Sequence, residues 1–157
     1  MPQGQNGEII VKGAGVMREY YKNPQKTAET LKDGWLYTGD IARIDEDGFY
    51  WITDRKKDVI ITGGENIYPV EIEEILHTHP KIYDAAVIGI PDERLGEITA
   101  AIIDAKPGVV LTEQEVIDFC AQGLAHFKRP RRIFFGKVPR NPTGKIEKPK
   151  LREKYRS

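Results

Sequence analysis

This sequence is poor in several features that would place it in other classes of protein. Its one cysteine, Cys120, excludes an internal disulfide and indicates a reducing compartment. No apolar run approaches the length of a membrane span, and residues 1–20 lack the apolar core of a signal peptide. Lys and Arg total 24, as do Asp and Glu, so no net field attracts nucleic acid or an anionic membrane. We therefore expect a cytoplasmic protein.

Residues that bind metals are also few and badly spaced. His77, His79 and His126 have no spacing that pairs them with each other or with Cys120 as a metal site. Cys120 lies on the apolar face of a predicted helix, so we expect it to be buried in a core. The sequence predicts no metal site.

The 157 residues have room for one domain, or for one small domain and a fragment. Residues 7–13 predict a strand, residues 23–30 a short helix, and residues 41–53 a hairpin. A few strands and one short helix would be marginally stable alone.

Residues 57–157 predict a compact α+β unit. Strands are predicted at residues 85–90, 98–103 and 131–135, which gives a three-stranded, mainly antiparallel sheet packed by helices. The helices are predicted at residues 69–77, after the capping box at 112–115, and at 148–155. In the first helix, Ile72, Ile75 and Leu76 form the apolar stripe, and Glu71, Glu73 and Glu74 are expected to face solvent.

Where these two parts meet, four kinds of local sequence pattern follow one another. Residues 54–58 (Asp-Arg-Lys-Lys-Asp) indicate an exposed joint, and residues 59–61 indicate a strand buried on both faces. Gly63 and Gly64 permit positive φ and close approach of another molecule, and Pro69 begins a helix. This order suits a mobile ligand-binding module. A charged turn before an ordinary strand and helix is the alternative, which the local pattern alone favours.

Four motifs resemble, in order and spacing, those in the C-terminal region of adenylate-forming enzymes. They are residues 37–40 (Tyr-Thr-Gly-Asp), 54–58, 63–69 (Gly-Gly-Glu-Asn-Ile-Tyr-Pro) and 139–145 (Pro-Arg-Asn-Pro-Thr-Gly-Lys). This superfamily includes acyl-CoA synthetases, firefly luciferase and the adenylation domains of peptide synthetases. Residues 63–69 are most similar to the fatty-acid and aryl acid–CoA ligases, and the resemblance extends from about residue 7 to residue 155.

The resemblance implies a fold and a reaction. Residues 1–56 would be the β-rich tail of a large N-terminal adenylation domain, ending at a hinge, and residues 57–157 the mobile C-terminal α+β domain. The parent enzyme would be an ATP-dependent, AMP-forming acid–CoA ligase that makes an acyl-adenylate and then a thioester. The family's phosphate loop, its magnesium-binding acidic motif and its acyl pocket do not occur among these residues. We therefore expect ligase activity only with a separate large domain, which would bind Mg²⁺.

The same resemblance implies site residues. Lys145 would be catalytic, because a mobile cation on a loop can neutralise charge on a phosphoryl group; the alternative is a solvated surface lysine. Asp40 and Arg55 would bind the nucleotide, ATP or AMP. Their alternatives are a turn aspartate and an exposed ion pair of Arg55 with Asp54 or Asp58.

Lys57 would be the hinge residue. Gly63, Gly64 and Glu65 would bind CoA, where the backbone approaches the pantetheine arm, and a simple tight turn is the alternative. A basic cluster could meet the 3′-phosphate of CoA but is predicted to be a solvated loop; its members are Lys128, Arg129, Arg131 and Arg132.

A second function stays open at this point. The chain could be a stand-alone binding or regulatory module that kept the fold without the reaction. The intact Lys145, Gly64 and Asp40 favour the ligase. The carboxylic acid cannot be identified, because no acyl pocket is present.

Overall fold

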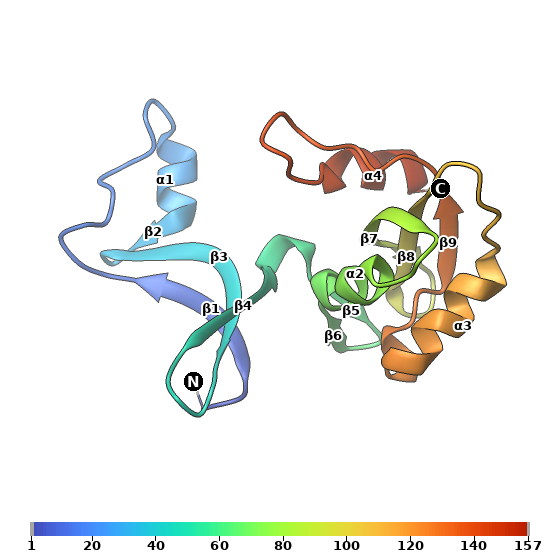
Figure 1. Ribbon diagram of the computed structural model, residues 1–157. Helices are drawn as coiled ribbons and strands as arrows, with labels where there is room; N and C mark the ends of the chain where they lie inside the picture. The colour runs from blue at the N-terminus through green and yellow to red at the C-terminus, as the bar shows by residue number, and fades with distance from the viewer. Residues whose placement is uncertain (1, 157) are drawn as a thin grey trace. The chain divides into compact units, whose positions relative to one another are not determined.

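The structure, a computed structural model, describes residues 2–156. Backbone contacts divide the chain into two compact units, Met1–Lys57 and Asp58–Ser157. In Figure 1 the first unit runs from blue to blue-green and the second from green to red. No helix among the described residues is both long enough and apolar enough to cross a membrane.

The first unit is a four-stranded sheet with one helix. Its strands have the order β1-β3-β2, and β4 pairs antiparallel with β3. The elements are β1 (Asn6–Val11), α1 (Pro24–Thr30), β2 (Leu31–Lys32), β3 (Trp35–Ile44) and β4 (Tyr50–Arg55). α1 begins at Pro24 because Asn23 Oδ1 accepts a hydrogen bond from Lys26 N at 2.9 Å. Among the described residues of this unit, the buried apolar side chains are Ile41 and Ala42, so its own core is small.

The second unit is a mixed α+β domain. Its strands are β5 (Ile60–Thr62), β6 (Glu65–Ile67), β7 (Ile82–Asp92), β8 (Gly96–Ala105) and β9 (Arg132–Phe135). Its helices are α2 (Pro69–His77), α3 (Glu113–Gly123) and α4 (Lys148–Tyr155), with 3₁₀ turns at Lys56–Asp58 and His126–Lys128. The predicted α+β class is confirmed. The sheet has five strands rather than the predicted three, in the order β6-β5-β8-β7, with β9 parallel to β8.

The β7–β8 pair is buried on both faces, and alternate residues of β7 and β8 supply the two cores. Ala85, Val87 and Ile103 lie in the core that includes residues of α2 and α3, whereas Ile88 and Ile102 lie in the core that includes Leu151 of α4 (Figure 1). Cys120 is fully buried in the first core, as predicted, and burial raises the pKa of its thiol to about 11. This thiol therefore stays protonated at neutral pH.

Glu73 does not face solvent, which corrects the prediction for α2. It is 7% exposed, its Oε1 accepts from Val87 N at 2.7 Å, and Lys148 Nζ lies 2.9 Å from the same oxygen. Lys148 is also 7% exposed. This buried ion pair joins α4 to α2.

The charged joint is only partly exposed, which is a second correction. Asp54 and Asp58 are buried, and Asp58 Oδ1 accepts from Arg152 of α4 at 2.7 Å. Ile60 is buried but Ile61 is 54% exposed, so β5 is buried on one face and not on both. The predicted solvated basic loop is also partly engaged, because Lys128 pairs with Glu71 at 2.8 Å and Arg129 donates to carbonyl groups at the end of α3.

The buried pair generates a stability prediction. Lys148→Met would leave the Glu73 carboxylate buried without its counter-charge, so we expect a loss of about 3 kcal/mol in the free energy of unfolding. Lys150→Met is the matched control, because Lys150 pairs with Glu147 in the same helix turn but is exposed. Its expected loss is below about 1 kcal/mol. Urea denaturation measures both, and equal losses would contradict the role of the buried pair.

His79 makes the stability depend on pH. Its ring packs edge-on against Phe119 with centroids 4.6 Å apart, and Nδ1 accepts from Lys81 N at 3.2 Å. Burial and the Lys81 charge lower the pKa of His79 below 6.5, so protons bind the unfolded chain more readily than the folded one. Stability should therefore fall as the pH drops below about 6.5.

We expect His79→Gln, which does not titrate, to reduce that fall. Urea denaturation of both proteins at pH 7.5 and pH 5.5 measures it. An identical loss in the two proteins would show that His79 does not contribute.

Candidate functional site

Asp40 and Arg55 lie directly opposite each other on β3 and β4. Arg55 Nη1 lies 2.8 Å from Asp40 Oδ1 and also donates to Thr38 O at 3.2 Å. Arg55 therefore forms an ion pair with Asp40, whereas Asp58 pairs with Arg152. The two residues predicted to bind the nucleotide are neighbours, and the Arg55 side chain is 53% exposed.

Residues 38–40 form an irregular segment of β3 that is held by β1. Gly39 has φ +74°, and its amide donates to Glu8 Oε1 at 3.1 Å. Thr38 Oγ1 donates to Ile9 O at 2.8 Å and accepts from Asp40 N at 3.0 Å. Glu8 Oε2 also pairs with Lys56 at 2.8 Å, so one carboxylate joins this segment of β3 to the charged residues 54–58.

No sequence motif marks Glu8. Only the pairing of β1 with β3 brings Glu8 beside residues 38–40, in register with Ile41. A hollow of about 210 Å³ opens here, lined in part by Glu8, Thr38, Gly39 and Lys56. Polar groups of both charge signs thus surround a small concavity within the first unit.

Gly63 and Gly64 form the two-residue turn between β5 and β6. Thr62 pairs with Glu65, and the glycines have φ values of +57° and +90°, as a type I′ turn requires. A side chain at Gly63 would meet Leu95 Cδ2 at 3.2 Å, whereas one at Gly64 would meet, apart from its chain neighbours, no atom of residues 2–156 within 4 Å. Gly64 thus presents bare, exposed backbone on the surface of the second unit.

Lys145 lies on a loop that is closed by its own hydrogen bonds. Asn141 Oδ1 accepts from Thr143 N at 3.0 Å, Thr143 Oγ1 at 2.8 Å and Lys145 N at 2.9 Å. Asn141 N donates to Lys145 O, and Gly144, with φ +83°, donates to Asn141 O, both at 2.9 Å. Within residues 2–156, the exposed Lys145 amine has no hydrogen bond or ion pair and is available to an anion.

Arg140 joins the base of this loop to the sheet. It donates to both carboxylate oxygens of Asp84 at 2.8 and 2.9 Å, and to Gly144 O at 2.6 Å. Burial raises the pKa of Asp84, but hydrogen bonds from Arg140 and His77 outweigh burial and bring the pKa below its ordinary value. Asp84 also raises the pKa of Arg140. In the sequence, Arg140 stands out only as part of a motif, and no motif marks Asp84.

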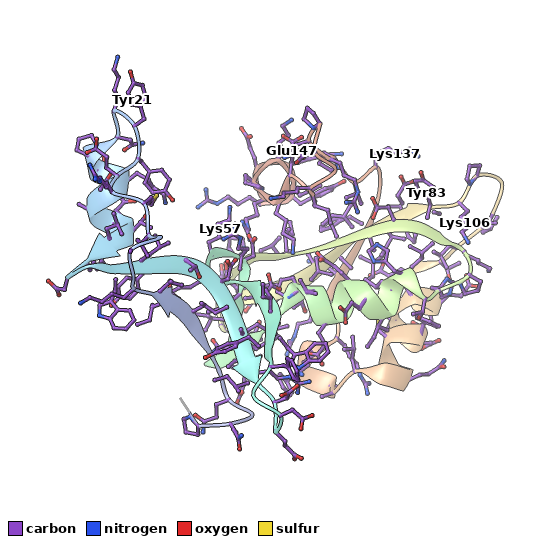
Figure 2. All side chains as sticks on the ribbon, turned by 60° about the vertical axis from the view of Figure 1, so that its left-hand side comes forward. Tyr21, Lys57, Tyr83, Lys106, Lys137 and Glu147 are labelled. Carbon is purple, nitrogen blue, oxygen red and sulfur yellow. The ribbon has the colours of Figure 1, made fainter. Side chains whose placement is uncertain are left out.

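The candidate residues are divided between the two units. The first holds Asp40 and Arg55 and ends at the exposed Lys57, which Figure 2 labels. The second holds residues 63–65 and Lys145. Among residues 2–156, no three His, Cys, Asp or Glu side chains are grouped so that they could hold a metal ion.

Residues 71–145 match the family model of the AMP-binding enzyme C-terminal domain. The chain is 49% identical to 3-[(3aS,4S,7aS)-7a-methyl-1,5-dioxo-octahydro-1H-inden-4-yl]propanoyl:CoA ligase from Rhodococcus jostii. The 152 aligned residues cover 96% of this chain and 30% of the relative. The chain is 46% identical over 154 residues to 2-succinylbenzoate–CoA ligase from Bacillus cytotoxicus, with 98% and 32% covered. The chain thus spans about a third of the length of these relatives.

Solved structures of related enzymes have the same fold as this chain. The crystal structure of ATP-bound MatB from Rhodopseudomonas palustris superposes with a TM-score of 0.91 at 39% identity, covering 100% of this chain and 32% of that one. The o-succinylbenzoate CoA synthetase MenE from Bacillus subtilis, in complex with the acyl-adenylate intermediate OSB-AMP, gives 0.87 at 36% identity, with 96% and 31% covered.

Proposed function

We propose, from the membership of residues 71–145 in the AMP-binding enzyme C-terminal domain family, that this chain works as the C-terminal part of a carboxylic acid–CoA ligase. The reaction would be ATP-dependent and AMP-forming. ATP, CoA and a carboxylic acid would be the substrates, and a large adenylation domain would be the partner that holds Mg²⁺. We place the enzyme in the cytoplasm, which the single buried cysteine supports.

The observation that carries this proposal is the free amine of Lys145 on an ordered loop. In adenylation, a carboxylate oxygen attacks the α-phosphorus of ATP, and the bond to pyrophosphate breaks. Negative charge builds on the phosphoryl oxygens, and a cation that is already in place lowers the free energy of that state. Lys145 can take this role because no group among the described residues neutralises its charge.

Asp40 and Arg55 would bind the nucleotide. The Asp40 carboxylate can accept hydrogen bonds from two ribose hydroxyl groups, and the half-exposed Arg55 can contact the ribose or a phosphate. Their ion pair supports this assignment, because Arg55 holds the Asp40 carboxylate in one orientation. A turn aspartate that only satisfied backbone amides would need no such cation.

The turn at Gly63 and Gly64, with Glu65, would serve the second half-reaction. There the CoA thiol attacks the carbonyl carbon of the acyl-adenylate, and AMP leaves. Because no described residue other than its chain neighbours would contact a side chain at Gly64, the pantetheine arm could lie against its backbone. The positive φ of Gly64 favours glycine in any case, so the turn geometry and the ligand require the same residue.

Lys57 would be the hinge between the two half-reactions. The boundary between the compact units falls directly after it, and its side chain is exposed. A hinge residue must absorb large changes of φ and ψ without losing buried contacts. Residues 1–56 would then stay with the large domain, while residues 57–157 rotate.

The two half-reactions can be separated in a ligase assembled from this chain and a large adenylation domain. Lys145→Ala should slow adenylation by at least about a hundredfold, since removing one preorganised charge-stabilising group costs about 3 kcal/mol. It should leave the conversion of a supplied acyl-adenylate nearly intact. Gly64→Leu should do the reverse. Pyrophosphate release reports the first step and thioester formation the second. Unchanged adenylation in Lys145→Ala would favour a binding module instead.

Restricting the backbone at position 57 tests whether Lys57 is the hinge. Lys57→Pro should permit adenylation but block thioester formation, because proline fixes φ. Lys57→Ala is the control, since it removes the same charge and keeps the rotation. If both variants form thioester at the wild-type rate, position 57 is not the hinge.

A further inference from the structure

Two aspartates lie opposite each other at one end of the β7–β8 strand pair. Asp84 on β7 and Asp104 on β8 are register partners, and their side chains are 13% and 10% exposed. Like charges placed directly opposite destabilise a sheet, so each needs a cation. Lys137 lies 3.1 Å from Asp104, and Arg140 contacts Asp84. Both cations come from the segment that leads to the Lys145 loop.

Only one of these two ion pairs reaches the loop. Lys137 Nζ contacts Asp104 and lies 6.0 Å from the centroid of the Tyr83 ring, beside which Figure 2 shows it. Arg140 instead uses its fork on Asp84 and a further N–H on Gly144 O, the carbonyl directly before Lys145. The backbone of Arg140 also forms an antiparallel bridge with Ile146.

Asp84 is itself held in place. Its Oδ1 accepts from Ala85 N at 2.9 Å and lies 3.1 Å from His77 Nε2 on α2. The lowered pKa of Asp84 keeps its carboxylate ionised at neutral pH, which preserves the pair with Arg140. The carboxylate is therefore a fixed anchor and not a mobile surface group.

The other end of the loop is anchored as well. Lys148 forms the buried pair with Glu73, so positions 140 and 148 are both fixed while the Lys145 amine between them stays free. A side chain presented from an already ordered loop loses less conformational entropy when it engages a ligand.

We propose that Asp84 is a positioning residue that, through Arg140, holds the Lys145 loop in the arrangement that adenylation uses. The kinetic part of this inference rests on the proposed function, whereas the structural part can be tested on the 157-residue chain alone.

The first test compares Asp84→Asn with Asp104→Asn, which removes an equally buried carboxylate from the facing position. Amide hydrogen exchange, followed by NMR, reads the Gly144 and Lys145 amides, both of which donate to Asn141. We expect exchange at both to be faster by about tenfold or more in Asp84→Asn, because charge-assisted hydrogen bonds to Arg140 are lost. Asp104→Asn should leave them unchanged. Equal effects of the two variants would overturn the proposal.

Arg140→Lys keeps the proposal testable if Asp84→Asn destabilises the whole unit. Lysine retains the charge but cannot bond both Asp84 oxygens and Gly144 O together, so exchange in the loop should again accelerate while core amides of β8 stay protected. Exchange like that of the wild type in Arg140→Lys would mean that charge alone suffices, which contradicts a positioning role.

The assembled ligase supplies the kinetic readout. Asp84→Asn should lower kcat of adenylation about tenfold, with KM for ATP and the thioester step unchanged, because Lys145 is misplaced and not lost. A raised KM with unchanged kcat would overturn the positioning role. If Lys145→Ala has no effect on adenylation either, the proposed function fails, and the exchange experiment still decides whether Asp84 orders the loop.

Discussion

The outer edge of β7 is the constraint on which the second unit depends. Among the described strands, β7 pairs with β8 alone, so amides on its other side need acceptors from elsewhere. Glu73 of α2 accepts from Val87 N, and the Ala85 amide donates to Asp84 Oδ1, which lies 3.1 Å from His77 Nε2, one helical turn after Glu73. Two polar side chains of α2, four residues apart, thus lie along this strand edge.

Glu73 brings a negative charge into the interior, and the placement of the C-terminal segment depends on neutralising this charge. Once Glu73 is buried, a cation must accompany it, and Lys148 at the start of α4 supplies one. α4 then carries Leu151 into the second core and Arg152 to Asp58. The Lys145 loop is therefore held at its α4 end by Lys148, while Arg140 holds its other end.

Periodicity and capping predict the main elements of this unit but not its buried charges. The capping box at Thr112 and the apolar stripe of α2 are local features, and both are present. Glu73 was expected in solvent because its partner Lys148 is remote in sequence, and no periodic pattern marks a buried acidic side chain. β5 was predicted as a strand at residues 59–61 but not as part of this sheet, and β6 was not predicted, because strands of three residues are too short to show alternation.

The candidate site was likewise predicted only in part. The resemblance to adenylate-forming enzymes identified the site motifs, and the match of residues 71–145 to the AMP-binding enzyme C-terminal domain confirms this resemblance. The pairing of Asp40 with Arg55, however, depends on an irregular register between Ile41 and Ala42 of β3 and their partners on β4. Asp84 belongs to no motif. Its position opposite Asp104 and its hydrogen bond from the Arg140 guanidinium are visible only in the structure.

Asn141, whose side-chain oxygen accepts three hydrogen bonds in the Lys145 loop, also determines how this loop ages chemically. Asparagine deamidates when the backbone nitrogen of the next residue attacks its side-chain carbonyl carbon and forms a succinimide ring. The next residue here is Pro142, whose nitrogen carries no hydrogen and cannot close that ring in the usual way. The loop is thereby protected against this common form of spontaneous damage over the lifetime of the protein.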